Sequence, residues 1–178
     1  MQRKEGFMSI VEKKNFQTFQ DSNSVYKPSN ERETSNIIKE IYNKNLPIKI
    51  IGSNSKNFIG NKLQCTKILD LSSLSGIVEY LPDELYIKVK ACTPISLIEE
   101  TLEKNNQQLA FEPIDFGYIN DFKSNKGTAA GQLSCNFSGS RRFKVGSIRD
   151  HVLGFRGING KGDIIKSGGT VVKNVTGI

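Results

Sequence analysis

Several residue types that would place the chain in a chemical class are scarce. Tryptophan is absent, histidine occurs once, at His151, and cysteine occurs three times, at Cys65, Cys92 and Cys135. One histidine and widely spaced cysteines without a Cys-x-x-Cys pair provide neither a zinc site nor a disulfide framework. We therefore expect no metal, and we expect the cysteines to be buried free thiols in a reducing compartment.

Long apolar runs are missing as well. No stretch approaches the roughly 20 apolar residues that a membrane span requires. The polar residues 1–5 are not followed by the apolar core of a secretory signal. We expect a cytoplasmic protein without a transmembrane segment, which would lie at the inner membrane only through partners.

The residues that are present suit a globular chain. Of 178 residues, 37% are hydrophobic and 24% are charged, which is enough for one ordinary domain. The formal net charge is +7, with 25 basic and 18 acidic residues. The basic residues are scattered and form no recognition-helix pattern, so we interpret them as solvated surface. Nucleic-acid binding is a weak alternative, and no nucleic-acid partner is expected.

Hydrophobic periodicity predicts an α+β fold. Helical spacing begins near Asn30, where Ser29 can cap a helix, and again at Pro94, where Thr93 can do so. The pair Asn159-Gly160 predicts a hairpin. Strands are expected over residues 48–51, 67–71, 77–81, 85–91, 152–158 and 163–166.

The two halves of the chain differ in composition. Residues 1–24 are polar and form an N-terminal arm in this interpretation. A helix–strand alternation follows up to about residue 110, and small residues become dense beyond it. We therefore predict one domain over residues 25–178, divided into subdomains of about 25–110 and 111–178 and truncated at its C-terminus.

Four segments could approach an anion, because small residues let backbone N–H groups converge on it. The segments are Gly52-Ser53-Asn54-Ser55-Lys56-Asn57, Gly127-Thr128-Ala129-Ala130-Gly131, Ser138-Gly139-Ser140-Arg141-Arg142 and Lys173-Asn174-Val175-Thr176-Gly177. In the same order, their structural alternatives are a surface turn, tight helix packing, a surface arginine pair without a partner and a frayed tail.

In their order along the chain, these segments resemble the FAD-binding domain of the vanillyl-alcohol-oxidase type, or PCMH domain. Within this family, the chain resembles in particular the FAD-binding subunits of glycolate oxidases. Further segments that carry the resemblance are Leu69-Asp70-Leu71-Ser72, Ala91-Cys92-Thr93-Pro94, Phe111-Glu112-Pro113-Ile114-Asp115, Ile148-Arg149-Asp150-His151-Val152 and Asn159-Gly160-Lys161-Gly162. The resemblance covers roughly residue 25 to the end.

The resemblance implies a two-subdomain fold with FAD held non-covalently between the subdomains. The first loop would wrap the pyrophosphate, Val152 would lie near the adenine, and residues 173–177 would lie close to the isoalloxazine. The implied cofactor residues are Gly52, Ser53, Asn54, Ser55, Lys56, Asn57, Pro113, Thr128, Ala129, Ala130, Gly131, Ser138, Gly139, Val152, Lys173 and Gly177.

The chain also departs from the family pattern. Ser53 and Asn54 stand where glycines are common, and Ala130-Gly131 replaces a double glycine. These changes add side-chain bulk beside the phosphate. Residues 52–60 contain no histidine or cysteine, so covalent flavin attachment is not expected.

By the same resemblance, the chain is the FAD-binding part of a flavin-dependent 2-hydroxy-acid oxidoreductase, with glycolate oxidation to glyoxylate as the leading reaction. Its partners would be a second FAD-binding subunit and an iron–sulfur subunit. The alternatives are a non-catalytic FAD-binding or assembly module, a D-lactate dehydrogenase-type flavoprotein and the cell-wall precursor reductase. No residue stands out as a catalytic base, and substrate residues are expected outside this domain.

Overall fold

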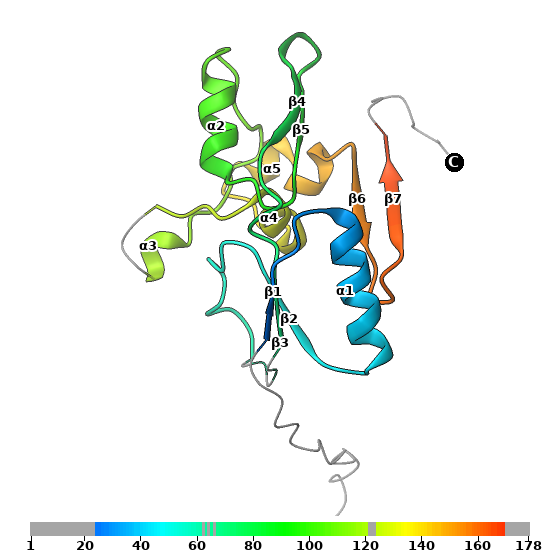
Figure 1. Cartoon of the computed structure of the whole chain (residues 1–178). Helices are drawn as coiled ribbons and strands as arrows, with labels where there is room; N and C mark the ends of the chain where they lie inside the picture. Colours follow the sequence, from blue (N-terminus) through cyan, green and yellow to red (C-terminus); the bar gives the residue numbers. More distant parts are fainter. Residues whose placement is uncertain (1–23, 62, 64, 66, 121–123, 170–178) are drawn as a thin grey trace, which may run out of the picture.

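The structure is a computed structural model that describes residues 24–61, 63, 65, 67–120 and 124–169 (Figure 1). Most of the predicted N-terminal arm therefore lies outside the described residues, and Ser24 begins the first strand. The elements are β1 (Ser24–Tyr26), α1 (Glu31–Asn43), β2 (Ile48–Ile51), β3 (Lys67–Asp70), β4 (Ile77–Leu81), η1 (Pro82–Glu84), β5 (Tyr86–Val89), α2 (Ile95–Glu103), α3 (Gly117–Asn120), α4 (Ala129–Cys135), α5 (Arg142–Val145), η2 (Ile148–His151), β6 (Gly154–Ile158) and β7 (Ile164–Gly168).

The mixture of helices and strands confirms the α+β prediction. Among the described residues, no helix has the length and apolar character needed to cross a membrane. The predicted strands are present, each within a few residues of its expected bounds.

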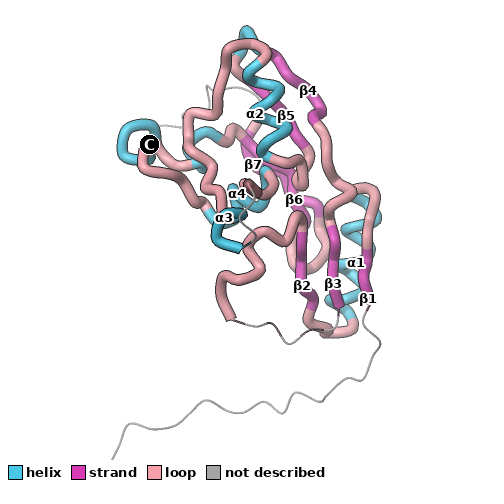
Figure 2. The backbone as a smooth tube through the Cα atoms, turned by 90° about the vertical axis from the view of Figure 1, so that its left-hand side faces the viewer, coloured by secondary structure: helices cyan, strands magenta, loops and turns pink. Residues whose placement is uncertain are grey.

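A parallel sheet in the order β1-β3-β2 forms the lower part of the molecule (Figure 2). β3 is the central strand, and its Leu69 is fully buried between Tyr26 of β1 and Ile50 of β2 in the register. Parallel strands place their carboxyl ends at one edge of the sheet. The chain leaves this edge at Ile51 and enters the first candidate loop directly.

Helix α1 begins one residue later than expected. The side chain of Asn30, not Ser29, accepts the N–H of Glu33 at 2.9 Å. Ser29 instead donates its N–H and its hydroxyl to the Glu33 carboxylate, at 2.7 and 2.9 Å. Asn30 takes the cap because its backbone is extended, with φ −152° and ψ 170°, as an N-cap requires.

The main apolar core lies between α2 and the antiparallel β4–β5 hairpin. Ile95, Ile98 and Leu102 of α2 are buried there, against Tyr80, Ile87 and other partly buried side chains of the hairpin and its surroundings. Their i, i+3, i+7 spacing produces the apolar stripe that the sequence predicted.

Thr93 does not cap α2, contrary to prediction. Pro94 is the N-cap and makes no side-chain hydrogen bond. Thr93 is fully buried, and its hydroxyl donates to the Lys90 carbonyl at 2.7 Å and accepts the Gly76 N–H at 3.0 Å. This tertiary use of the hydroxyl competes with the capping role.

The predicted hairpin forms from β6 and β7, and Asn159 organises the turn between them. Asn159 accepts the N–H groups of Lys161 and Asp163, both at 2.9 Å, and Gly162 adopts the left-handed φ of +86°. The hairpin packs beside α1 (Figure 1). The Ser35 hydroxyl donates to the Gly162 carbonyl at 2.5 Å, and Arg156 binds the Glu31 carboxylate with its Nε and Nη2 atoms.

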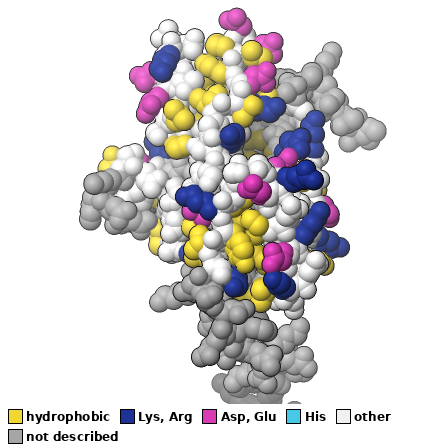
Figure 3. All heavy atoms as spheres, in the orientation of Figure 1, with side chains coloured by type: hydrophobic (Ala, Val, Ile, Leu, Met, Phe, Trp, Pro, Cys, Tyr) yellow, Lys and Arg dark blue, Asp and Glu magenta, His cyan; other side chains and the backbone are white. Residues whose placement is uncertain are grey.

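Lysine and arginine side chains gather on the side of the molecule formed by α1 and the β6–β7 hairpin (Figure 3). Exposed cations there include Arg32, Lys39, Lys161 and Lys166. The three cysteines are free, but only Cys92 is buried, and Cys135 is exposed. The expectation of buried thiols is therefore wrong for Cys135, which ends a helix at the surface.

Candidate functional site

The loop of residues 52–57 follows β2 at the carboxyl edge of the parallel sheet. Asn54 adopts a left-handed φ of +56°, whereas Ser53 does not. Asparagine tolerates this conformation better than most residues, so the replacement of glycine at Asn54 causes little strain. The backbone N–H groups of Gly52, Ser53 and Asn54 donate to no other described residue. This loop therefore has amide donors available for an anion.

A second loop, ending at Gly127, meets the first. Gly127 has a φ of +77°, and a Cβ added to it would lie 2.8 Å from Ser55 Oγ and 3.0 Å from Lys56 Nζ. A Cβ added to Gly52 would lie 3.1 Å from Cys92 Sγ and 3.4 Å from Thr128 Oγ1. The structure thus brings together two segments of candidate residues that are 70 positions apart in the sequence, and glycine allows the close approach.

Lys56 belongs to the first loop, and its half-buried ammonium lies against Gly127 of the second loop. Among the described residues, no carboxylate lies within ion-pair distance of its Nζ atom. Burial lowers the pKa of the Lys56 ammonium, and the nearby Cys135 thiol opposes this shift. The Nζ atom also lies 5.8 Å from the centre of the Phe116 ring. A cation in this position lacks the counter-charge that burial requires, and an anionic ligand would provide it.

The first amides of α4 have partners within the fold, which agrees with the packing alternative given for residues 127–131 in the sequence analysis. Ala129 donates to the Thr93 carbonyl and Ala130 to the Ala91 carbonyl, both at 2.9 Å. The Gly131 N–H donates to the Thr128 hydroxyl at 3.3 Å, which is the N-cap bond. These bonds attach the start of α4 to the segment before α2, so the backbone donors of the cleft come from the first loop.

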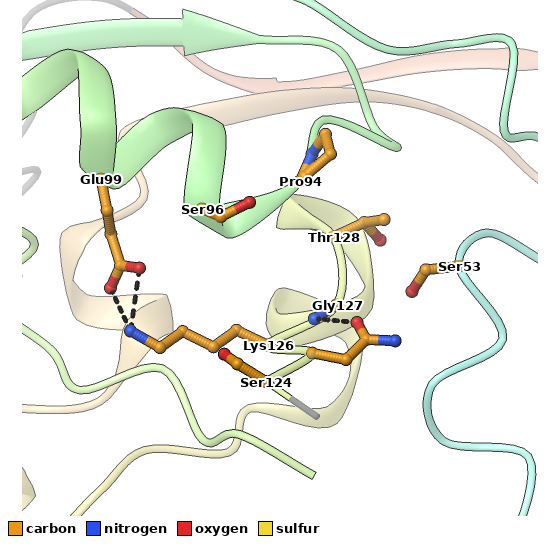
Figure 4. A pocket seen from close by; sticks show the side chains of 9 residues that line it. Ser53, Pro94, Ser96, Glu99, Ser124, Lys126, Gly127 and Thr128 are labelled. Carbon is orange, nitrogen blue, oxygen red and sulfur yellow. Dashed lines mark hydrogen bonds and ion pairs between the residues drawn. The ribbon is translucent and has the colours of Figure 1, made fainter. Parts of the chain in front are cut away.

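A pocket of about 240 Å³ opens beside the two loops, with Ser53, Gly127 and Thr128 in its lining (Figure 4). Its other wall contains Glu99 of α2 and Lys126, whose Nζ lies 2.8 Å from both carboxylate oxygens. About two thirds of the Glu99 side chain is covered. Sequence reasoning missed this pair because Lys126 approaches from 27 positions away.

Pro113 and the Ser138-Gly139 turn lie on neighbouring segments. The Gly139 N–H donates to the Glu112 carbonyl at 2.9 Å, and the Ser138 hydroxyl accepts the Ile148 N–H at 3.1 Å. Phe116 links these segments to the first loop, since its ring contacts Phe58 and Phe137 edge-on, with ring centres 5.8 and 5.4 Å away.

In the part of the chain that the structure describes, the remaining candidate residues are not seen in contact with the two loops. Val152 follows η2, and within the described chain no hydrogen bond or ring contact joins it to the 52–57 or 127–131 segments. Lys173 and Gly177 lie outside the described residues. The part of the predicted site that the structure assembles is therefore the pair of loops with Lys56 between them, flanked by the Pro113 and Gly139 segments.

Gln132 is a buried polar residue that the motif analysis did not identify. Its side chain is fully buried, and its Nε2 donates to the carbonyls of Ile114 and Lys126. Its Oε1 is buried without a partner among the described atoms. Gln132 thereby fixes the two chain segments that lead to Pro113 and to Gly127. Its position in the sequence, inside a short helix, contained no signal of this role.

The fold and this cleft define a class of cofactor-binding domain. The profile of the FAD binding domain family matches residues 23–168, so this chain belongs to that family. The predicted PCMH-type fold and the predicted cofactor, FAD, are thereby confirmed.

Individual relatives agree with this assignment. The chain is 41% identical over 131 residues to the glycolate oxidase subunit GlcE of Escherichia coli (strain K12). The aligned region covers 74% of this chain and 35% of the relative. The chain thus spans about a third of the curated relative that it matches.

Solved structures support the fold alone. Two crystal forms of alkyldihydroxyacetonephosphate synthase superpose with TM-scores of 0.62 and 0.56, at 16% and 17% sequence identity. They cover 85% and 74% of this chain, and 27% and 24% of the synthase.

Proposed function

We propose that the chain holds FAD non-covalently, with the diphosphate in the cleft between residues 52–57 and 127–131. The observation that carries this proposal is the position of Lys56. It is a half-buried ammonium without a carboxylate partner in the described chain, next to backbone N–H groups that have no acceptor. A diphosphate supplies the negative charge and the acceptor oxygens that this arrangement lacks.

Gly127 allows the second loop to pack directly against the first. An added Cβ would lie 2.8 Å from Ser55 Oγ and 3.0 Å from Lys56 Nζ. The departures at Asn54 and Ala130 do not oppose binding. Asn54 tolerates its left-handed backbone, and Ala130 lies inside α4, where alanine is favourable.

The chemistry of Cys92 favours a non-covalent complex. Cys92 is the cysteine that lies against Gly52 at the start of the first loop. Burial raises the pKa of its thiol, and the neighbouring Asp70 adds to this effect. A thiol held in its protonated form is a poor nucleophile. Flavin attachment through this cysteine is therefore disfavoured.

We further propose that the chain is the FAD-binding part of a 2-hydroxy-acid oxidoreductase of the glycolate oxidase type. The identity to GlcE over most of this chain supports the proposal. Bound FAD supplies the acceptor for the hydride that leaves the hydroxyl-bearing carbon. The residues of this chain bind and orient the cofactor. Substrate recognition is assigned to the two thirds of the relative's length that this chain does not span.

The proposed partners are a second FAD-binding subunit and an iron–sulfur subunit, in a cytoplasmic complex that reaches the inner membrane only through such partners. GlcE is by name a subunit of glycolate oxidase, which supports partner subunits in general. A D-lactate dehydrogenase-type enzyme is the second candidate, because the cofactor cleft does not distinguish glycolate from lactate. A non-catalytic module that only stabilises the complex is the third.

The cofactor proposal is tested by purifying the 178-residue chain and titrating it with FAD. We expect flavin absorbance in the near-ultraviolet and blue to remain with the protein after gel filtration, and acid precipitation to release all of it. A colourless chain that takes up no added FAD would overturn the proposal, and flavin that stays with the precipitate would overturn the non-covalent part.

The substrate proposal needs the complete protein with its partner subunits. We expect reduction of an artificial electron acceptor with glycolate, at a higher kcat/KM than with D-lactate. A preference for D-lactate would favour the second candidate. An active complex whose turnover is unchanged when this chain cannot bind FAD would favour the non-catalytic module.

A further inference from the structure

Glu112 holds the turn of residues 138–141 with both its backbone and its side chain. Its carbonyl accepts the Gly139 N–H at 2.9 Å. Its Oε2 atom accepts the Arg141 N–H at 2.9 Å and the Ser140 hydroxyl at 3.3 Å. Glu112 directly precedes Pro113, so one residue connects two segments that the sequence analysis assigned to the flavin.

This connection depends on the missing side chain of Gly139. A Cβ at that position would lie 2.5 Å from Glu112 Oε2 and 2.6 Å from Glu112 Cβ. Gly139 has no positive φ, so its backbone conformation is open to other residues. Glycine is therefore needed here for space, because the turn lies directly against the Glu112 side chain.

We infer that Glu112 is a positioning residue for FAD, in that it fixes the placement of Pro113 relative to the 138–141 turn. This inference rests on the proposed function and on the contacts of Pro113 and Gly139 with FAD that the family resemblance implies. Without the carboxylate, the Arg141 N–H and the Ser140 hydroxyl lose their acceptor, and the turn is free to move away from Pro113. The turn of residues 138–141 would then no longer be in position to contact FAD.

Three variants separate positioning from general stability. E112A removes the acceptor. E112Q keeps an acceptor oxygen in the same place and loses the charge. E33A is the matched control, because Glu33 accepts an N–H and a hydroxyl from Ser29 in the same manner, at 2.7 and 2.9 Å, but in the turn before α1. FAD dissociation constants are measured by flavin fluorescence, and stability is measured by urea unfolding.

The positioning role predicts a specific order. E112A should weaken FAD binding about tenfold, because the turn of residues 138–141 loses its acceptor and moves away from Pro113. E112Q should stay within about threefold of the unaltered chain, since its amide oxygen still accepts the Arg141 N–H. E33A should lose stability without changing FAD affinity. If E112A does not fold, G139A replaces it, because its Cβ would push the turn away from Glu112.

Several outcomes would overturn the inference. FAD affinity that is unaltered in E112A, or in a folded G139A, would show that the turn does not need Glu112. Equal weakening in E112A and E112Q would assign the effect to charge. Tighter binding in both would show that the carboxylate repels the diphosphate. If the unaltered chain itself takes up no FAD, the proposed function fails instead, and the two failures are distinguishable.

Discussion

Lys56 and Gly127 approach each other so closely that a Cβ on Gly127 would lie 3.0 Å from Lys56 Nζ. The lysine comes from the loop after β2, and the glycine precedes α4. The two loops are therefore in direct contact at these two residues.

Replacing Lys56 by methionine should weaken FAD binding. The variant K56M keeps most of the side-chain length and removes the charge. Charge-assisted hydrogen bonds contribute about 1.5–3 kcal/mol, so the dissociation constant should rise about 10- to 100-fold. Isothermal titration calorimetry measures the change. K88M is the control, because Lys88 is exposed on β5 and away from the cleft. Equal affinities of K56M and K88M would show that the diphosphate does not meet Lys56.

Replacing Gly127 by alanine should destabilise the fold and close the cleft. A left-handed backbone costs an L-residue about 1–2 kcal/mol, and the new Cβ would lie 2.8 Å from Ser55 Oγ. G60A is a matched control, because Gly60 has a similar φ of +88° and nothing within 4 Å of its added Cβ.

Both variants should therefore lose stability in urea unfolding, and only G127A should lose FAD affinity. A G127A chain that binds FAD as well as G60A does would place the cofactor elsewhere.

FAD affinity should fall as the pH rises towards 10.5. Burial lowers the pKa of Lys56 below its ordinary value of 10.5. A bound diphosphate favours the charged form and raises that pKa again. At pH values between the lowered pKa of Lys56 in the free chain and its higher pKa in the complex, FAD binding should therefore take up a proton. Calorimetry in two buffers of different ionisation enthalpy measures this uptake, and K56M should abolish it.

The same shift has the opposite sign for the folding of the free chain. The pKa of Lys56 is lower in the folded than in the unfolded state, so the buried charge opposes folding at pH values below the lowered pKa. This penalty disappears as the pH rises through the lowered pKa towards 10.5. The contribution of Lys56 to the free energy of unfolding should thus increase over this range, and K56M should remove the increase.

Replacing Ser35 by alanine should weaken the attachment of the β6–β7 hairpin to α1. The buried Ser35 hydroxyl donates to the Gly162 carbonyl, and a hydrogen bond of this kind contributes about 0.5–1.5 kcal/mol net. T101A is the control, because the Thr101 hydroxyl bonds to Leu97 within its own helix. Urea unfolding should show a loss for S35A and a smaller one for T101A. A larger loss for T101A would contradict this account.

Local patterns in the sequence predicted much of this fold. The strand at Ile48–Ile51, the apolar stripe of α2 and the β6–β7 hairpin all follow from spacing and turn residues within short windows. Lys56 could be chosen as an anion-binding candidate because charge and small residues occur together in one loop. Each of these features depends on residues that are neighbours in the chain.

The errors arose where a distant segment uses a local group. Thr93 has the sequence of a helix cap, but its hydroxyl binds Gly76 and Lys90. At the start of α4, where the sequence left a phosphate site and tight packing as alternatives, the carbonyls of Ala91 and Thr93 occupy the first amides. Glu99 pairs with Lys126, which no helical pattern reveals. Such partners are set by tertiary packing, which overrides local propensity.

The bond between Ser35 and Gly162 also concerns the order in which the chain folds. The two residues are 127 positions apart, and contacts between such distant residues form late because closing a long loop costs entropy. During synthesis, the face of α1 that carries Ser35 stays exposed to solvent until the turn of the β6–β7 hairpin has left the ribosome. A nascent chain that ends before Gly162 therefore exposes the face of α1 that carries Ser35.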